Sequence, residues 1–332
     1  MRYFKFLLIL LTGLTLFISC KNKLNVNADW QDITVVYGIL NQNDSVHDLK
    51  ITKAFLGEGD ALRFAKIPDS STYPNKLDVR LEEWQSGSLV DTISFDTITI
   101  NNKEEGDSIF YYPYQLVYRA NHKLNENSVY KLKIINHKTG KETTSQTPLV
   151  GHLDVKTPAQ IPGSRAGFDT ILDNDVSWFA AKNGAQYQLV IRFHYTEVLI
   201  ADTSHKTQQF IDWVIFTDEK ALDTTGVYPN DYAFPGKGFY LNAGHHIPVN
   251  PLVYRLAGNV DYIFTVAAGD LSTYMQVNQP STTIVQEKPF FTNITNGIGL
   301  FSSRYDRTIS LLPSNLTKQC LKYSSYTYML GF

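Results

Sequence analysis

A repeated alternation of apolar and polar residues constrains the fold of this 332-residue chain more than any other feature. Residues 77–83 show it most clearly, because charged residues separate Leu77, Val79 and Leu81. Successive side chains of a strand point to opposite faces of a sheet, so a period of two predicts a half-buried β-strand.

Similar runs recur at short intervals along the chain, separated by stretches rich in Asn, Gly and Ser that predict turns. Aromatic residues reach 13%, with 20 Tyr and 19 Phe, and these side chains suit pleated surfaces. One short helix is expected at residues 271–278, because Asp270 precedes it and Pro280 follows. The expected strands are residues 33–40, 48–56, 77–83, 89–100, 129–135, 187–193, 211–217 and 262–267.

The strands are expected to form two domains, residues 28–150 and residues 151–332, with a Pro- and Gly-containing seam at 157–163. In the second domain, Trp178 is followed by a turn at Asn183–Gly184 and an alternating strand. This arrangement resembles the B–C hairpin region of fibronectin type III domains. The predicted fold class is therefore all-β, with two tandem β-sandwich domains of the immunoglobulin/fibronectin III type.

The first nineteen residues have the composition of a secretory signal peptide. Arg2 and Lys5 are followed by the uncharged apolar run 6–18, which is too short to span a bilayer permanently. A small residue, Ser19, then precedes Cys20. Residues 1–19 are therefore expected to be removed.

The sequence Phe17-Ile18-Ser19-Cys20 resembles a bacterial lipobox. The resemblance implies cleavage before Cys20 and attachment of acyl chains to this residue, with residues 20–27 as a lipidated tether. Two or three acyl chains anchor a protein stably where one does not. The alternative, an ordinary secreted protein with an incidental cysteine, is less favoured.

Charge and motifs exclude several functional classes. Without residues 1–19, 28 basic and 32 acidic side chains remain, and no basic cluster indicates a nucleic-acid partner. No nucleophile elbow, phosphate loop or His-Glu-x-x-His motif occurs. His245–His246 is interpreted as a surface-loop pair, and Asp173 with Asp175 as a plain turn that lacks the later residues of a calcium loop. The chain is expected to be non-enzymatic, with no catalytic residues, cofactor or metal.

Residues 290–311 contain the run Thr-Asn-Ile-Thr-Asn-Gly-Ile-Gly-Leu-Phe. Together with residues 35–57 and 130–150, this run resembles an uncharacterised family of Bacteroidota outer-membrane lipoproteins. Genes of the family often lie beside a gene for a TonB-dependent receptor. The resemblance implies an accessory partner of an outer-membrane barrel, with the membrane contacted through the acyl chains. The residues after Cys20 lack acidic side chains, which favours the periplasmic face over the cell surface.

The glycines of this run allow two interpretations. Gly297 and Gly299 permit unusual backbone conformations or close approach, while Phe301 supplies an apolar side chain. The favoured interpretation is a tightly packed, bulged strand that closes the second sandwich. The alternative is a contact surface for a partner barrel, formed by Gly297, Gly299 and Phe301.

Asp-Ser and Asp-Thr followed by Ala, Ile, Leu, Val, Met or Thr resemble the O-glycosylation acceptors of exported Bacteroidota proteins. Six acceptor positions match this pattern: Ser45, Thr92, Thr97, Ser108, Thr170 and Thr224.

An alternative function is a surface glycan-binding lipoprotein. The aromatic run 110–114 offers a stacking platform for sugar rings, although packing within the core and at its rim is the favoured role. The same judgement applies to Tyr323, Tyr326 and Tyr328.

Overall fold

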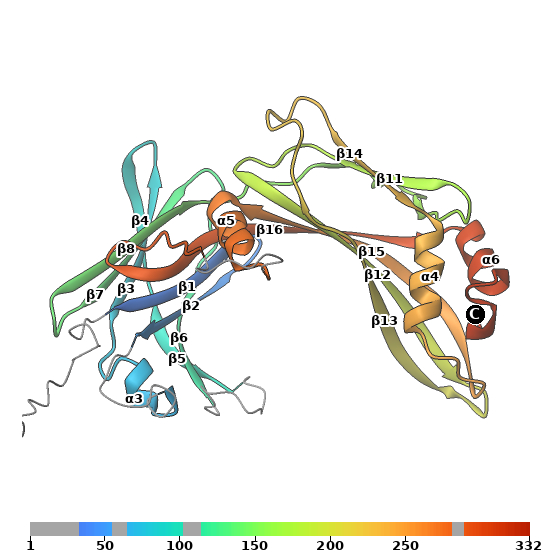
Figure 1. The fold of residues 1–332 in the computed structure, drawn as a ribbon, viewed down its shortest axis with the longest axis horizontal. Coiled ribbons are helices and arrows are strands. Elements are labelled where there is room, and N and C mark those ends of the chain that lie inside the picture. Colours follow the sequence, from blue (N-terminus) through green and yellow to red (C-terminus); the bar gives the residue numbers. More distant parts are fainter. Residues whose placement is uncertain (1–32, 55–64, 102–113, 281–288) are drawn as a thin grey trace, which may run out of the picture.

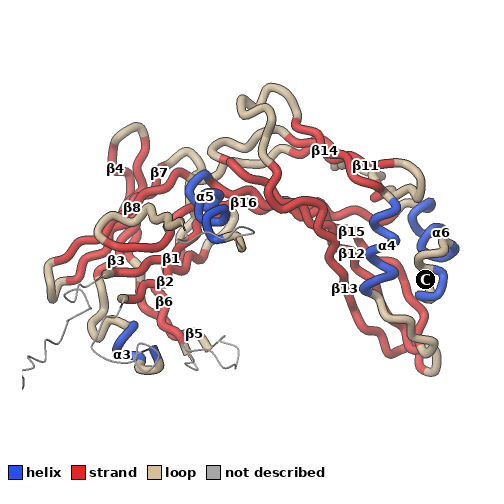
Figure 2. The backbone as a smooth tube through the Cα atoms, in the orientation of Figure 1, coloured by secondary structure: helices blue, strands red, loops and turns tan. Residues whose placement is uncertain are grey.

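The computed structural model describes residues 33–54, 65–101, 114–280 and 289–332, and it is mostly β-strand (Figures 1 and 2). The expected all-β class is therefore confirmed. In chain order the elements are β1 (Thr34–Asn41), β2 (Val46–Lys53), α3 (Pro68–Ser71), β3 (Asp78–Gln85), β4 (Ser88–Ser94), β5 (Asp96–Ile100), β6 (Gln115–Asn121), β7 (Val129–Asn136), β8 (Lys141–Pro148), β9 (Val155–Thr157), β10 (Arg165–Ala166), β11 (Asp173–Trp178), β12 (Gly184–Leu199), β13 (Asp202–Glu219), β14 (Asn230–Pro235), α4 (Lys237–His246), β15 (Val253–Ala268), α5 (Gly269–Asn278), β16 (Gly297–Pro313), α6 (Asn315–Tyr323) and the 3-10 helix η1 (Tyr328–Leu330).

The described strands form three sheets. The largest has the strand order β13-β12-β15-β16-β1-β2-β6-β5, with β10 paired to β16 beside this path. The second has the order β4-β3-β7-β8, and the third has the order β14-β11-β9.

Strand β16 joins the two ends of the molecule (Figure 1). Its first part, from Gly297 to Arg304, runs parallel to β1. Its second part, from Arg304 to Leu311, pairs with β15 in antiparallel orientation. The last long strand of the chain therefore completes the sheet that the first strand begins.

Buried apolar residues form two large clusters. The first lies between β1, β2 and the four-stranded sheet, and it includes Leu49, Leu81 and Leu132 together with Ile294 and Phe301 from the far end of the chain. The second surrounds Trp178, whose fully buried ring lies close to Tyr187, Phe216 and Phe264 of the large sheet. The division expected at residue 150 stays a prediction, but strand β16 contributes side chains to both clusters.

Several local expectations are confirmed, and one strand differs. The helix expected at residues 271–278 is α5, and Ser86 and Gly87, which lie in a short polar stretch of the kind expected to form turns, both have positive φ between β3 and β4. The single strand expected at residues 89–100 is wrong, because β4 and β5 belong to different sheets. Phe95, which separates them, is buried in the first cluster. Its burial allows the chain to cross from one sheet to the other.

Helices α4 and α6 were not expected from the sequence. Helix α4 packs beside β13, since a Cβ on Gly238 would lie 2.4 Å from the Trp213 ring. His245 and His246, expected in a loop, form the exposed last turn of this helix. The stability of such short helices comes more from packing against the surface that they cover than from the helix propensity of their own sequence.

Candidate functional site

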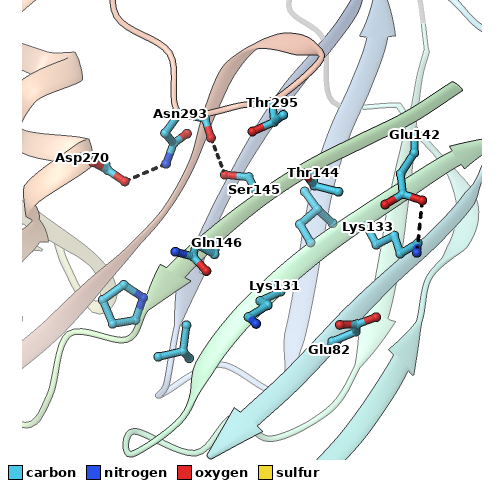
Figure 3. A pocket seen from close by; sticks show the side chains of 13 residues that line it. Glu82, Lys131, Lys133, Glu142, Thr144, Ser145, Gln146, Asp270, Asn293 and Thr295 are labelled. Atoms are coloured by element: carbon cyan, nitrogen blue, oxygen red, sulfur yellow. Dashed lines mark hydrogen bonds and ion pairs between the residues drawn. The ribbon is translucent and has the colours of Figure 1, made fainter. Parts of the chain in front are cut away.

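A groove of about 800 Å³ lies beside the four-stranded sheet (Figure 3). Its floor is formed by β3, β7 and β8, and its wall by the start of α5 and the segment that precedes β16. We call this site the polar groove, and its lining residues are Glu82, Val129, Lys131, Leu132, Lys133, Glu142, Thr144, Ser145, Gln146, Pro148, Asp270, Asn293 and Thr295.

The charged side chains of the floor follow from strand alternation. Leu81 and Leu132 face the core, so the neighbouring residues Glu82, Lys131 and Lys133 face outward. Lys133 Nζ lies 3.1 Å from an oxygen of Glu142 on β8. The ion pair between Lys133 and Glu142 therefore compensates part of the charge on the floor.

Trp84 supports one end of this floor. Its Nε1 donates a hydrogen bond to Glu82 Oε2 at 2.9 Å, and Lys131 Nζ lies 3.7 Å from its ring centroid. The indole therefore orients one carboxylate and one ammonium group of the groove.

Asn293 builds the wall. Its side chain accepts a hydrogen bond from the backbone N–H of Phe301 and donates to the Phe301 carbonyl, at 3.0 and 2.7 Å. The same amide donates to Asp270 Oδ2 at 2.8 Å, and Ser145 Oγ donates to the Asn293 carbonyl (Figure 3). The Asn293 side-chain amide thus bonds both backbone groups of Phe301, as the backbone of a neighbouring strand would.

The wall also covers the outer edge of β8. Thr144 and Thr295 exchange two backbone hydrogen bonds, at 3.2 and 2.8 Å. Asn296 Nδ2 donates to the Glu142 carbonyl, and Ser303 Oγ donates to the Pro148 carbonyl. Because backbone groups two residues apart point to the same side of a strand, those of Gln146 point to the same outer edge as those of Thr144.

Neither His nor Cys lines the groove, and its polar side chains are hydroxyls, amides, carboxylates and ammonium groups that can form hydrogen bonds with a ligand. Within the described ranges, no three His, Cys, Asp or Glu residues come together as a metal site. Sequence reasoning did not find this site, because its residues come from segments about 200 positions apart. The run that contains Asn293 was noted for its resemblance to a family. The hydrogen bonds of the Asn293 side chain could not be predicted from the sequence, because they form only when distant segments come together in the fold.

A second surface feature lies at the opposite end of the molecule, where α4, α6 and the C-terminus meet (Figure 1). Arg255 is buried there, and it binds Glu197 and the carbonyls of Pro248 and Leu330. Exposed apolar side chains project from the segments around it, with Leu252 67% and Tyr328 61% exposed. We call this set the distal apolar surface, and it consists of Ile200, Val249, Leu252, Tyr326, Tyr328 and Met329.

Backbone contacts hold these segments together. Ile200 N donates to the Leu252 carbonyl at 2.9 Å, and Arg255 N donates to the Gly331 carbonyl at 2.7 Å. A Cβ on Gly244 of α4 would lie 2.4 Å from the Tyr326 carbonyl oxygen. Core and rim packing was favoured for Tyr323, Tyr326 and Tyr328, but all three rings are exposed by at least two-fifths of their surface.

The proposed partner contacts Gly297, Gly299 and Phe301 lie against this chain itself. Phe301 is fully buried, and a Cβ on Gly299 would lie 2.0 Å from the Val36 carbonyl oxygen. The partner-contact interpretation is therefore not retained, because β1 occupies this surface. The segment is a tightly packed strand, and the sheet that it closes is the one formed by the N-terminal strands.

The remaining sequence-predicted sites are scattered over the surface. Among the candidate glycosylation acceptors, Ser45, Thr92 and Thr224 are exposed, while Thr97 and Thr170 are half-buried. Ser108, Cys20 and the aromatic residues 110–113 lie outside the described residues. Asp173 and Asp175 belong to strand β11 and not to a turn, and both are exposed.

Comparison with known proteins returned neither a matching family model nor a matching curated protein. In the part of the chain that the structure describes, none of the helices has the length and apolar character needed to cross a membrane.

Proposed function

We propose that this chain is a lipid-anchored outer-membrane protein without enzymatic activity, which acts as an accessory partner of an outer-membrane barrel such as a TonB-dependent receptor. Acyl chains on Cys20 attach it to the membrane, with the periplasmic face favoured. The observation that carries the proposal is the distal apolar surface. Clustered exposed apolar side chains mark interaction sites on soluble bodies, and Tyr and Met are enriched at protein interfaces.

We also propose that the two hydrophobic clusters are the cores of two tandem β-sandwich domains of the immunoglobulin/fibronectin III type. The position of Trp178, which packs from the three-stranded sheet against the large sheet, supports this assignment for the second domain.

Crosslinking followed by purification from detergent-solubilised outer membrane tests the partner. We expect a barrel protein to be recovered with the wild type and lost with Leu252→Asp combined with Tyr328→Asp. The matched control is Ile171→Asp, since Ile171 is 88% exposed and lies outside the distal apolar surface. Recovery of no barrel protein, or equal recovery with the double variant, would contradict the proposal.

The anchor has a separate test. Cys20→Ser should abolish acylation and leave an uncleaved precursor or a soluble form, because each buried CH₂ of an acyl chain contributes about 0.8 kcal/mol to membrane binding. Membrane fractionation and mass spectrometry of the N-terminus measure both outcomes. A processed but still membrane-bound variant would show that a protein partner holds the molecule there. Proteolysis of intact cells reports the face, and removal of the body would place it on the cell surface.

A further inference from the structure

We infer that the polar groove is a binding site for a neutral oligosaccharide segment. The inference is independent of the docking proposal, because the groove and the distal apolar surface lie at opposite ends of the molecule (Figure 1). It rests on the free hydrogen-bonding groups, the charge balance and the blocked strand edge of the groove.

The groove offers both donors and acceptors that this chain does not use. The amide of Gln146 and the hydroxyls of Thr144 and Thr295 are uncommitted, and Asp270 binds Asn293 through one carboxylate oxygen only. Sugar hydroxyls both donate and accept, so they match such a mixed set better than a ligand with a single kind of polar group.

Charge argues against a polyanionic ligand. Two ammonium groups, Lys131 and Lys133, face three carboxylates; Lys133 is paired with Glu142, while Lys131 lies over the neutral Trp84 ring. A phosphate or polyanionic chain would meet the carboxylates of Glu82 and Asp270, with only Lys131 of the two ammonium groups outside an ion pair. Val129 and Pro148 add apolar surface, which suits the C–H faces of pyranose rings.

The length of the groove indicates several sugar rings. From Glu142 to Pro148, β8 covers about 20 Å at the usual rise of a strand. Asp270 and Glu142 lie at opposite ends of this path (Figure 3). Both ends therefore provide carboxylate oxygens that can accept hydroxyl hydrogen bonds.

The blocked edge of β8 argues against an extended peptide as the ligand. Strand addition requires a row of free backbone groups. Here the carbonyls of Glu142 and Pro148 bind Asn296 and Ser303, and both backbone groups of Thr144 bind Thr295, so the edge offers no continuous row of free groups. Recognition must therefore depend on side chains.

The experiment is affinity electrophoresis of the mature full-length chain in gels that contain dextran, yeast mannan, xyloglucan, arabinoxylan or amylopectin. We expect at least one of these neutral polysaccharides to retard the protein. Thr144→Val combined with Gln146→Ala should weaken that binding by about tenfold or more, because it removes two uncommitted polar side chains.

The matched control is Thr207→Val combined with Gln209→Ala, which makes the same changes at the same spacing on exposed positions of β13. This control should bind like the wild type. Circular dichroism and unfolding midpoints confirm that both variants fold. Absence of retardation by all five polysaccharides, or equal loss in both variants, would overturn the assignment. Binding of polygalacturonate or of an extended peptide library in place of the neutral polysaccharides would also overturn it.

Discussion

Asn41 Nδ2 donates a hydrogen bond to Asp306 Oδ2 at 2.9 Å, across 265 positions of sequence. The other carboxylate oxygen of Asp306 accepts a hydrogen bond from Thr265 Oγ1, also at 2.9 Å. Asn41 ends β1 and Thr265 belongs to β15, so Asp306 links the two strands that flank β16. One side chain therefore connects the two halves of the large sheet.

Asp306→Ala should lower the free energy of unfolding by about 2 kcal/mol, because two partners lose their hydrogen bonds to a carboxylate. It should also reduce cooperativity, since β16 would couple the two hydrophobic clusters less tightly. Calorimetry measures both effects, and separation into two transitions is the expected signature. Asp231→Ala, on the exposed face of β14, should change neither quantity. A single unshifted transition for Asp306→Ala would exclude a linking role.

Gly299→Ala should destabilise the protein by about 3 kcal/mol or more. Gly299 has a φ of +116°, and an added Cβ would lie 2.0 Å from the Val36 carbonyl oxygen. The parallel pairing of β16 with β1 would have to separate to admit the methyl group. Urea unfolding followed by tryptophan fluorescence measures the change. Gly269→Ala is the control, since no atom lies within 4 Å of its added Cβ, and it should be neutral or slightly stabilising.

Arg255→Met should cost about 3 kcal/mol, because it leaves Glu197 and the carbonyls of Leu330 and Pro248 without their cationic partner. The carbonyl of Leu330 is one of them, so the C-terminal residues should become accessible to carboxypeptidase. Mass spectrometry of the digestion products detects this release. Arg165→Met, at an exposed position, should leave both stability and digestion unchanged. Protection of the C-terminus in Arg255→Met would show that other contacts suffice to hold it.

The His47 ring should make stability depend on pH. His47 is 3% exposed, and its Nε2–H donates to the His122 carbonyl at 2.9 Å. Burial lowers the pKa of His47 below the ordinary value of 6.5, and the hydrogen bond to His122 opposes this effect only in part. The unfolded state therefore binds the proton more readily, and stability that is present above pH 6.5 is lost as the pH falls below it.

His47→Gln keeps a donor for the His122 carbonyl but removes the titration. We expect a smaller loss of unfolding free energy than in the wild type when the pH is lowered from about 7.5 to about 5.5. Urea unfolding at both pH values measures it, with His205→Gln on β13 as the exposed control. Equal pH dependence in His47→Gln and the wild type would mean that other groups cause the effect.

The sequence by itself determined the features that neighbouring residues encode. The alternation around Leu81 specified an outward and an inward face of β3, and the turn at Asn183–Gly184 with the alternating residues after it specified the start of β12. Helix α5 was delimited by Asp270 and Pro280. Each of these depends on local periodicity or on a backbone restriction, which acts over a few residues.

Only the tertiary structure decided which strands pair and which side chains meet. Nothing near Gly297 in the sequence indicates that β16 lies parallel to β1, because that pairing requires closure of a loop of more than 200 residues and burial of Phe301 in the first cluster. The polar groove depends on the same pairing, since it places Asn293 and Asp270 beside β8. The exposure of Tyr326 and Tyr328 is set by how the C-terminus binds Arg255, and no local pattern specifies that contact.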